Sequence, residues 1–315
     1  MSSKEDSERT KSALVPPYPL IVNQLNDSKV IPFLGAGASL GGRKPGEAWK
    51  KGVRSFLPTA GELAGHLADT TAFPADEVRE LATVAQYFSV VGGRQPLTEE
   101  LHTIFNSDYK PGPLHEFLAG VSAPLLIVTT NYDDLIERAL DDENRRLGHR
   151  ARPYEVVIHT TEADTGDLLL WWPYGESEPR EVSPNKLDID LEKRTVVYKM
   201  HGAIDRGKAV RDQYVITEDD YIDFLTRMTT GKAVPAIFAE LFQTRHFLFL
   251  GYGLKDWNLR VVLNRVEKDL RRPKGITSWA IQHNPSELEK LFWSGRGVQV
   301  YDQLLDDFVR HLKIP

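Results

Sequence analysis

The stretch "VIPFLGAGASL" (Val30–Leu40) joins a short apolar run to a turn that contains two glycines. The apolar part, Val30–Leu34, is typical of a strand buried on both faces of a parallel sheet. Gly35 and Gly37 carry no side chain, so their turn allows an anion such as a phosphate to approach backbone N–H groups. The stretch therefore predicts a strand, a phosphate-binding turn and a helix. A turn that only needs the flexibility of glycine is the structural alternative.

The spacing of the glycines narrows the choice of ligand. A nucleoside triphosphate loop needs Gly, four residues and then Gly-Lys-Ser/Thr. Counting from Gly37, the second glycine is Gly42, but "RKP" follows it, so this loop is excluded. The dehydrogenase pattern Gly-x-Gly-x-x-Gly is met by Gly35 and Gly37, whereas Leu40 stands at its third position. The half match leaves a redox dinucleotide and a dinucleotide that is cleaved as alternatives.

Composition excludes several classes of protein. The chain has 315 residues, of which 41% are hydrophobic, enough for one large domain or two moderate ones. Its net charge of −6 gives no basic field for nucleic acid, and the absence of cysteine excludes disulfides and cysteine-based zinc sites. No apolar run approaches the roughly 20 residues that span a bilayer, and the N-terminus has no secretory signal. We expect a cytoplasmic protein with no membrane or direct nucleic-acid partner.

Apolar runs alternate with helical patterns along the chain. Further strands are expected at 123–131, 194–202 and 246–254, with weaker ones at 154–159 (an edge strand or a hairpin arm), 276–281 and 297–301. Helices are expected at 131–146 after the N-cap Asn131, at 255–272 after Asp256, and at 304–312. This alternation predicts an α/β fold with a doubly wound, mostly parallel Rossmann-like sheet.

The remaining segments predict how the domain is organised. Residues 1–14 are expected to form a flexible tail, and 15–315 one domain. A helical insertion is expected at about 59–118, and a helical pair at 218–244 begins after the cap Thr217. A second, irregular insertion at about 160–193 holds Trp171 and Trp172, which are expected to pack locally.

Polar or small residues follow four of the expected strands. Besides the first glycine turn, these are "TTNYDD" (129–134), "KMHGAID" (199–205) and "GYGLKD" (251–256). Each has a plain structural explanation as a helix cap, a core histidine or a tight turn. Together they predict a ligand site, because ligands of doubly wound sheets bind outside the carboxyl ends of the strands. The other histidines considered are scattered and expected to be structural, so no metal site is predicted: His149, His159, His246 and His283.

The order and spacing of "GAGAS", "TTNYD", "MHG" and "GYGL" resemble the sirtuin-type Rossmann domain from about Ser28 to the C-terminus. The resemblance is closer to the sirtuin-like domains of bacterial anti-phage defence systems than to the protein deacylases. Deacylating sirtuins carry a four-cysteine zinc ribbon and a Pro-Asp-Phe-Arg segment after the glycine turn. This chain has no cysteine and reads "GGRKPGEAWK" there. Compared with the deacylases, the chain thus largely retains the NAD-binding half, whereas the features of the peptide-binding half are missing.

The resemblance implies an NAD+ hydrolase that cleaves the nicotinamide–ribose bond, releases nicotinamide and ADP-ribose, and depletes NAD in abortive infection. His201 would be the general base, Asn131 would bind the ribose or orient water, and Asp133 would order the nicotinamide end. The resemblance also implies that the pyrophosphate is held by Gly35, Ala36, Gly37 and Ser39, and that the adenosine is held by Gly251, Tyr252 and Gly253. Thr130 would be a supporting hydrogen-bond donor.

Two other functions stay open at this point. One is an NAD-dependent protein deacylase or ADP-ribosyltransferase, and the other is a sensor that binds NAD or ADP-ribose without turnover. An unrestrained NAD hydrolase would kill its host, so we expect regulation through a homo-oligomer and a separate partner protein. The resemblance suggests a HerA-type ATPase as that partner.

Overall fold

The computed structural model of the chain describes residues 14–41, 43–44, 46–53, 55–161, 168–229, 234–253 and 277–312. The helix expected at 255–272 and its cap Asp256 lie outside these ranges, as does the expected tail up to residue 13.

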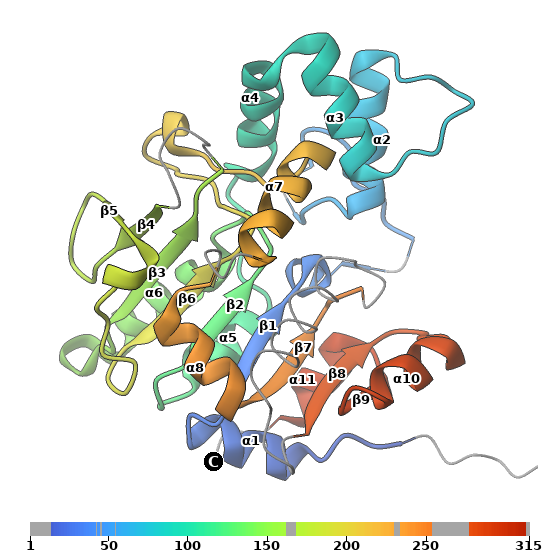
Figure 1. The fold of residues 1–315 in the computed structure, drawn as a ribbon. Helices are drawn as coiled ribbons and strands as arrows, with labels where there is room; N and C mark the ends of the chain where they lie inside the picture. The colour runs from blue at the N-terminus through green and yellow to red at the C-terminus, as the bar shows by residue number, and fades with distance from the viewer. Residues whose placement is uncertain are drawn as a thin grey trace, which may run out of the picture.

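Nine strands in the described ranges form one sheet in the order β5-β4-β3-β6-β2-β1-β7-β8-β9 (Figure 1). All neighbours are parallel except β3–β4 and β4–β5, which confirms the predicted doubly wound, mostly parallel α/β sheet. The strand expected at 154–159 is an arm of the antiparallel β3–β4 pair and also pairs with β6, so it is not an edge strand. The strands are β1 (Val30–Leu34), β2 (Leu126–Thr129), β3 (Tyr154–His159), β4 (Leu169–Trp172), β5 (Arg180–Val182), β6 (Thr195–Lys199), β7 (His246–Leu250), β8 (Ser278–Gln282) and β9 (Val298–Asp302).

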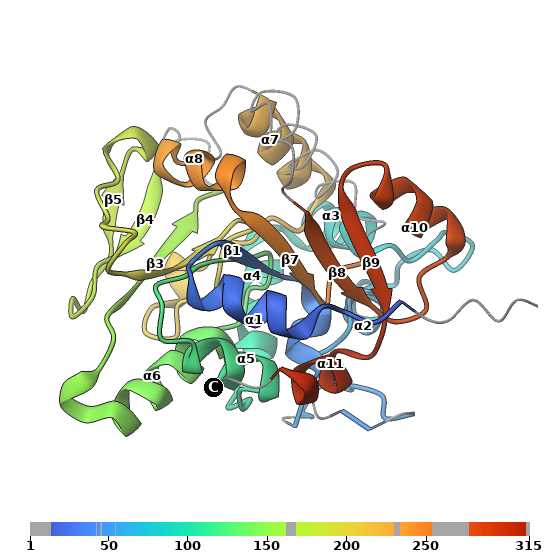
Figure 2. The same cartoon turned by 90° about the horizontal axis from the view of Figure 1, so that it is seen from below.

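Helices cover both faces of the sheet, as Figure 2 shows. One face packs against α1 (Tyr18–Asn26), α5 (Pro113–Gly120), α6 (Leu135–Leu147) and α11 (Leu305–His311). The other packs against α7 (Glu218–Thr229), α8 (Ala236–Thr244) and α10 (Glu287–Ser294). In β1, Val30 and Leu34 face the first layer while Ile31 and Phe33 face the second, which explains why the strand is apolar throughout.

Three further helices, α2 (Ala60–Thr71), α3 (Leu81–Gly92) and α4 (Arg94–Phe105), share a separate apolar cluster. Figure 1 shows them grouped beside α7, and hydrogen bonds from Thr83 to Glu218 (2.7 Å) and from Gln86 to Asp219 (2.8 Å) join α3 to α7. Thr217 caps α7 as predicted, since its Oγ1 accepts a hydrogen bond from the Asp220 N–H at 3.1 Å. These contacts place a helical wall beside the sheet.

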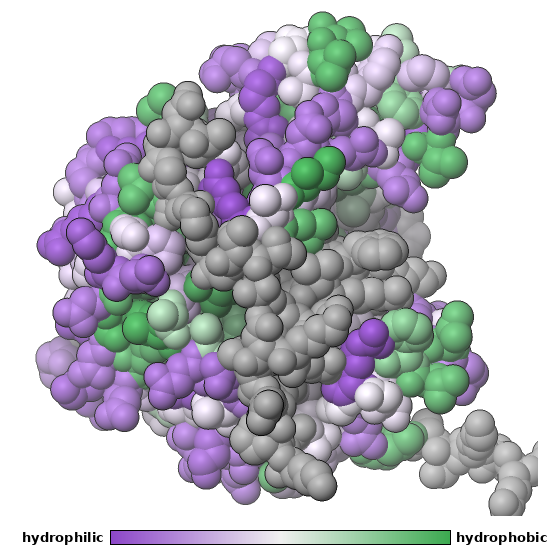
Figure 3. Space-filling model, viewed as in Figure 1, coloured by the Kyte–Doolittle hydropathy of each residue, from purple (hydrophilic) through white to green (hydrophobic). Residues whose placement is uncertain are grey.

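Helix α10 exposes two leucines, since Leu288 and Leu291 are 71% and 73% exposed. Figure 3 shows a green patch at the lower right, where α10 lies in Figure 1. Within the described ranges, no helix has the length and apolar character needed to cross a membrane.

Candidate functional site

The strand order places a crevice beside β1. The next strand along the chain, β2, lies on one side of β1, and β7 lies on the other side. The strand order therefore reverses at β1, and a crevice forms at the carboxyl ends of these strands. A cavity of about 350 Å³ lies there. All eleven site residues predicted from the sequence line it: Gly35, Ala36, Gly37, Ser39, Thr130, Asn131, Asp133, His201, Gly251, Tyr252 and Gly253.

Sequence reasoning missed the other wall of this cavity. Thr59, Ala60 and Leu63, at the start of α2, line it together with Leu81 of α3 and Tyr221 of α7. No strand end precedes these residues, so nothing in the sequence pattern placed them in the site. The segment 59–118 was expected to be helical, and the structure brings its first helix to the glycine turn.

The two glycine turns pack directly on each other. The Gly37 N–H donates to the Gly251 carbonyl at 2.8 Å, and a Cβ added to Gly37 would lie 2.8 Å from the same oxygen. The Gly37 amide is therefore used inside the protein and is not available to a phosphate. Ala36 begins the short helix η1 (Ala36–Leu40), where a first-turn amide has no partner within the helix. Of this turn, Ala36 is the exposed residue that lines the cavity.

A directed chain of hydrogen bonds fixes the orientation of Asn131. Its Nδ2 donates to the Gly35 carbonyl at 3.0 Å and to Ser39 Oγ at 2.9 Å, and Ser39 in turn donates to Asp133 Oδ2 at 2.8 Å. Both amide hydrogens of Asn131 are thus directed into the protein, which leaves Oδ1 as the group it offers to a ligand. The Ser39 hydroxyl hydrogen goes to Asp133 and not to a phosphate.

Asn131 does not cap a helix, so that part of the prediction is wrong. Helix α6 begins at Leu135, and Asp133 Oδ1 accepts the Leu135 N–H at 3.1 Å. Two backbone N–H groups instead hold the segment between β2 and α6. The backbone N–H of Asn131 donates to Thr129 Oγ1 at 3.0 Å, and the backbone N–H of Thr130 donates to the Leu34 carbonyl at 3.2 Å. Asn131 is therefore free of a helical role and faces the cavity.

His201 lies just after β6 with 4% of its surface exposed. Its ring packs edge-on against Tyr221 and Phe224, with centroids 5.5 and 5.1 Å apart. Gly202 has a φ of +85°, and a Cβ there would lie 2.1 Å from the Gln213 carbonyl, so only glycine fits after the histidine. The backbone thus holds the imidazole against α7 at the edge of the cavity.

The four histidines expected to be structural lie elsewhere. His159 is buried and packs on Phe224 with ring centroids 5.4 Å apart, and His246 stacks on Trp279 at 5.1 Å. His149 and His283 are exposed. Within the part of the chain that the structure describes, no group of three or more His, Asp or Glu side chains is arranged to hold a metal ion.

A family model for the SIR2-like domain matches residues 125–301, more than half of the chain. The chain belongs to the SIR2-like family. It is 29% identical over 248 residues to the NAD(+) hydrolase ThsA of Acinetobacter baumannii, covering 78% of this chain and 41% of the relative. It is 23% identical over 285 residues to the defense-associated sirtuin 2 of Bacillus subtilis, covering 90% and 24%.

A third similar protein is the NAD(+) hydrolase ThsA of Bacillus cereus, 26% identical over 237 residues and covering 73% of this chain. The SIR2-like chain therefore spans about two fifths or less of the length of the curated relatives described here. These matches confirm the resemblance drawn from the four short motifs.

A buried lysine supports the cavity of this SIR2-like chain from behind. Lys199, at the end of β6, has 1% of its side chain exposed, and its Nζ binds the Asp133 carbonyl and Glu137 Oε1, the latter at 2.8 Å. Burial raises the pKa of Glu137, while the ion pair with Lys199 opposes that rise. The lysine ties the end of β6 to the segment after β2 and to α6, and the sequence analysis did not single it out.

Replacing Lys199 with methionine is expected to lower the free energy of unfolding by about 3–5 kcal/mol, because Glu137 is left buried without its partner. Denaturant unfolding measures the change. Lys193→Met is the control, since Lys193 is 80% exposed and pairs only at the surface with Asp190. Equal stability of the Lys199→Met and Lys193→Met variants would show that the buried pair does not hold this edge of the sheet.

The start of α2 depends on one carboxylate. Glu62 accepts hydrogen bonds from Arg43 Nη1 at 2.8 Å, from the Trp49 N–H at 2.7 Å and from the Thr59 N–H at 2.9 Å. The hydrogen-bonded Arg43, with the two backbone donors adding to its effect, lowers the pKa of Glu62 to about 2. This network fixes the cavity wall formed by Thr59.

Glu62→Gln is expected to lower the free energy of unfolding by about 2 kcal/mol at neutral pH. The folded pKa lies below the unfolded one, so this stabilisation is present above about pH 4.3 and is lost as the pH falls towards 2. Unfolding measured between pH 7 and pH 3 should show the variant and the wild type converging at low pH. If the free energies of unfolding of the two proteins differ by the same amount across that range, the ionised carboxylate of Glu62 is not the cause of the difference.

Proposed function

We propose that this SIR2-like chain is an NAD+ glycohydrolase of anti-phage defence, which cleaves the nicotinamide–ribose bond. The observation that carries the proposal is the convergence of four strand-end motifs on one cavity of about 350 Å³. A cavity of this size suits a nucleotide ligand. The names of two similar proteins, both NAD(+) hydrolases, support the same activity.

The proposed reaction consumes water and gives nicotinamide, ADP-ribose and a proton. Nicotinamide carries a positive charge while it is bound to the ribose and leaves as a neutral molecule, so no general acid is needed. The barrier is the positive charge that develops on the ribose, and the protein lowers it by fixing the ribose and placing the water. The proposal assigns the pyrophosphate to the Ala36 amide and the adenosine to the turn at Gly251–Gly253.

In this proposal, Asn131 and His201 act at the nicotinamide ribose, where the bond is cleaved. Because both amide hydrogens of Asn131 are held by Gly35 and Ser39, its Oδ1 accepts a hydrogen bond from a ribose hydroxyl or from the attacking water. His201 removes a proton from the attacking water, whose other hydrogen can donate to Asn131. Asp133 fixes Ser39 and thereby the orientation of Asn131.

Product analysis separates hydrolysis from transfer. NAD is incubated with the purified chain, with and without an acetyl-lysine peptide, and the products are separated by chromatography. The proposal expects equal amounts of nicotinamide and ADP-ribose at a rate that the peptide does not change. Release that requires the peptide would establish a deacylase. Bound NAD that stays intact in the presence of the chain's physiological partner would establish a sensor.

We further propose that the protein acts in the cytoplasm as a homo-oligomer, where NAD depletion aborts infection, and that a separate protein, of HerA-type ATPase class, controls it. The exposed Leu288 and Leu291 of α10 offer an apolar surface suited to such contacts. Light scattering on the purified chain tests the oligomer. A monomer at micromolar concentration would contradict that part of the proposal.

A further inference from the structure

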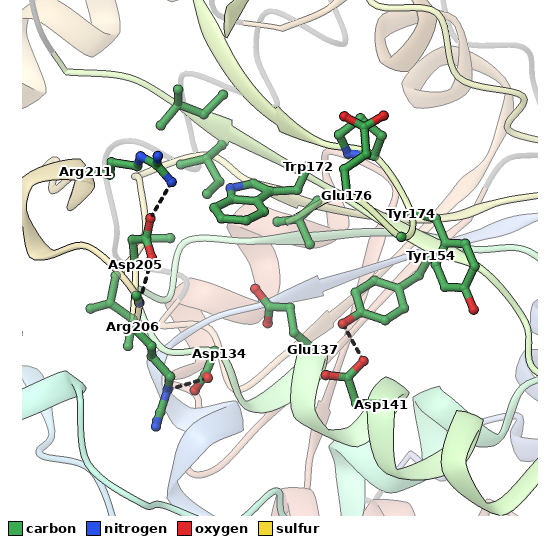
Figure 4. Close-up of a pocket in the computed structure, with 18 residues that line it drawn as sticks. Asp134, Glu137, Asp141, Tyr154, Trp172, Tyr174, Glu176, Asp205, Arg206 and Arg211 are labelled. Atoms are coloured by element: carbon green, nitrogen blue, oxygen red, sulfur yellow. Dashed lines mark hydrogen bonds and ion pairs between the residues drawn. The ribbon is translucent and has the colours of Figure 1, made fainter. Parts of the chain in front are cut away.

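A second cavity, of about 380 Å³ and lined in part by Trp172, adjoins the segments that follow β2 and β6 (Figure 4). Within these two segments, Asn131 and His201 line the cavity beside β1, whereas Asp134 and Arg206 line the second cavity. Asp134 and Arg206 form an ion pair, drawn as a dashed line in Figure 4. The pair ties together the two backbone segments that carry Asn131 and His201.

The main chain at His201 has further restraints. The Val215 N–H donates to the His201 carbonyl at 2.9 Å, and the positive φ of Gly202 lets the next residue fit against the Gln213 carbonyl. What this backbone does not set is the rotation of the imidazole about its side-chain bonds. A general base must stay within hydrogen-bond reach of the proton that it takes, so this rotation decides whether His201 can act.

Two aromatic rings from one helix limit that rotation. Tyr221 and Phe224 lie three residues apart on α7, so they share one face of the helix. Both pack edge-on against the His201 imidazole, with interplanar angles of 78° and 82°, an arrangement that aromatic pairs prefer. Phe224 is buried in the core, whereas Tyr221 lines the cavity beside β1. Tyr221 is thus the ring that meets both the imidazole and the cavity.

Helices α3 and α4 hold the first turn of α7, directly before Tyr221. Each of the three acidic side chains of this turn accepts a hydrogen bond from α3 or α4 at 2.7 to 2.8 Å: Glu218 from Thr83, Asp219 from Gln86 and Asp220 from Arg94. Arg94 also donates to the Tyr214 carbonyl at 2.7 Å, so it joins α4 to the segment that leads into α7. The position of Tyr221 is therefore set by α3 and α4 as well as by the sheet.

We propose that Tyr221 is a positioning residue for His201, and that its ring keeps the imidazole turned towards the ribose and the attacking water. The proposal rests on the hydrolysis proposed above, because it concerns the same base. The ring carries the role, since the ring is what packs against the imidazole. A displacement of about 1 Å at a reacting group can lower a rate about 10²-fold.

Tyr221→Leu is expected to lower the rate of nicotinamide release at saturating NAD about 10–100-fold, with little change in NAD affinity. Tyr221→Phe keeps the ring and should retain most of the rate. Tyr87→Leu is the matched control, because Tyr87 of α3 packs edge-on against Phe73 with centroids 5.2 Å apart and does not line the cavity. Its rate should equal that of the wild type.

Three results of these assays would overturn the proposal. They are an unchanged rate in Tyr221→Leu, a loss of NAD affinity without a loss of rate at saturation, and equal losses of rate in Tyr221→Leu and Tyr221→Phe. The second would make Tyr221 a direct contact of NAD, and the third would assign the effect to its hydroxyl.

A double variant separates a positioning role from a direct one. If Tyr221 acts through His201, Tyr221→Leu should lower the rate of the wild type but should not lower the rate of His201→Ala any further. Two losses that multiply would show that Tyr221 acts independently of His201, against the proposal.

A crystal structure of Tyr221→Leu without NAD gives a readout that does not depend on activity. The proposal expects the His201 imidazole to be rotated or to occupy more than one orientation, and to keep its wild-type orientation in Tyr221→Phe. An unmoved imidazole in Tyr221→Leu would contradict it even if the rate falls. Tyr221→Met, which fills the space with a flexible side chain, serves if Tyr221→Leu fails to fold. If the wild type releases no nicotinamide, the proposed hydrolysis fails, and the orientation of the imidazole still decides whether Tyr221 holds it.

Discussion

Replacing His201 with alanine is expected to lower the rate of nicotinamide release about 10²–10⁴-fold, the usual contribution of a positioned general base. NAD binding should change little, because the Ala36 amide and the Gly251–Gly253 turn, which are assigned the pyrophosphate and adenosine, remain in place. The rate is measured at saturating NAD, and the affinity is measured separately by titration. A fall in rate without a matching loss of affinity is the signature of a group that acts on the reacting atoms.

His159→Ala is the matched control for this experiment. His159 is also buried and packs against the same Phe224 ring as His201, but it does not line the cavity beside β1. Its loss should affect packing alone. Full activity of His201→Ala, or an equal loss of rate in both variants, would remove His201 from the reaction and leave it as a core histidine.

Gly251→Ala is expected to lower the free energy of unfolding by at least about 2 kcal/mol. Gly251 has a φ of +64°, which an alanine adopts only with strain. The added Cβ would also lie 2.2 Å from the Ala38 nitrogen and 2.5 Å from the Gly37 carbonyl carbon. These are backbone atoms of the first glycine turn, so relief requires the two turns to separate. Thermal and denaturant unfolding of the purified variant measure the loss.

Gly253→Ala, two residues further along the same turn, is the matched control. Among the described residues, a Cβ there meets nothing within 4 Å, and the residue has no positive φ, so the stability of the variant should stay within about 0.5 kcal/mol of the wild type. If Gly251→Ala lowers the free energy of unfolding no more than Gly253→Ala does, the two glycine turns do not pack as described.

The sequence alone predicted the sheet and the residues of one wall of the cavity beside β1. Apolar runs such as Val30–Leu34 are buried on both faces, so they signal parallel strands without an alignment. Once the strands are parallel, the residues after them must meet at one edge, which is why Asn131, His201 and Gly251 were found together. The local sequence pattern and the parallel topology were therefore enough to predict the sheet and to group these residues.

The remainder depends on contacts between distant segments. Tyr221 enters the cavity because α7 packs on α3, and Lys199 is buried because Glu137 lies opposite it on α6. Neither contact is signalled in the sequence by a hydrophobic period or by a motif. Asn131 was predicted as a helix cap because its residue type and position suit one, but hydrogen bonds to Gly35 and Ser39 hold it in another role. The second cavity, with Trp172, likewise arises only from the packed structure.

The most direct test of the central claim is a crystal structure of the His201→Ala variant with NAD, because it does not depend on an activating partner. The account predicts NAD in the cavity at the ends of β1, β2, β6 and β7, with the pyrophosphate at the Ala36 amide and the nicotinamide ribose within hydrogen-bond distance of Asn131 Oδ1. NAD bound elsewhere, or with its nicotinamide ribose remote from Asn131 and residue 201, would contradict it.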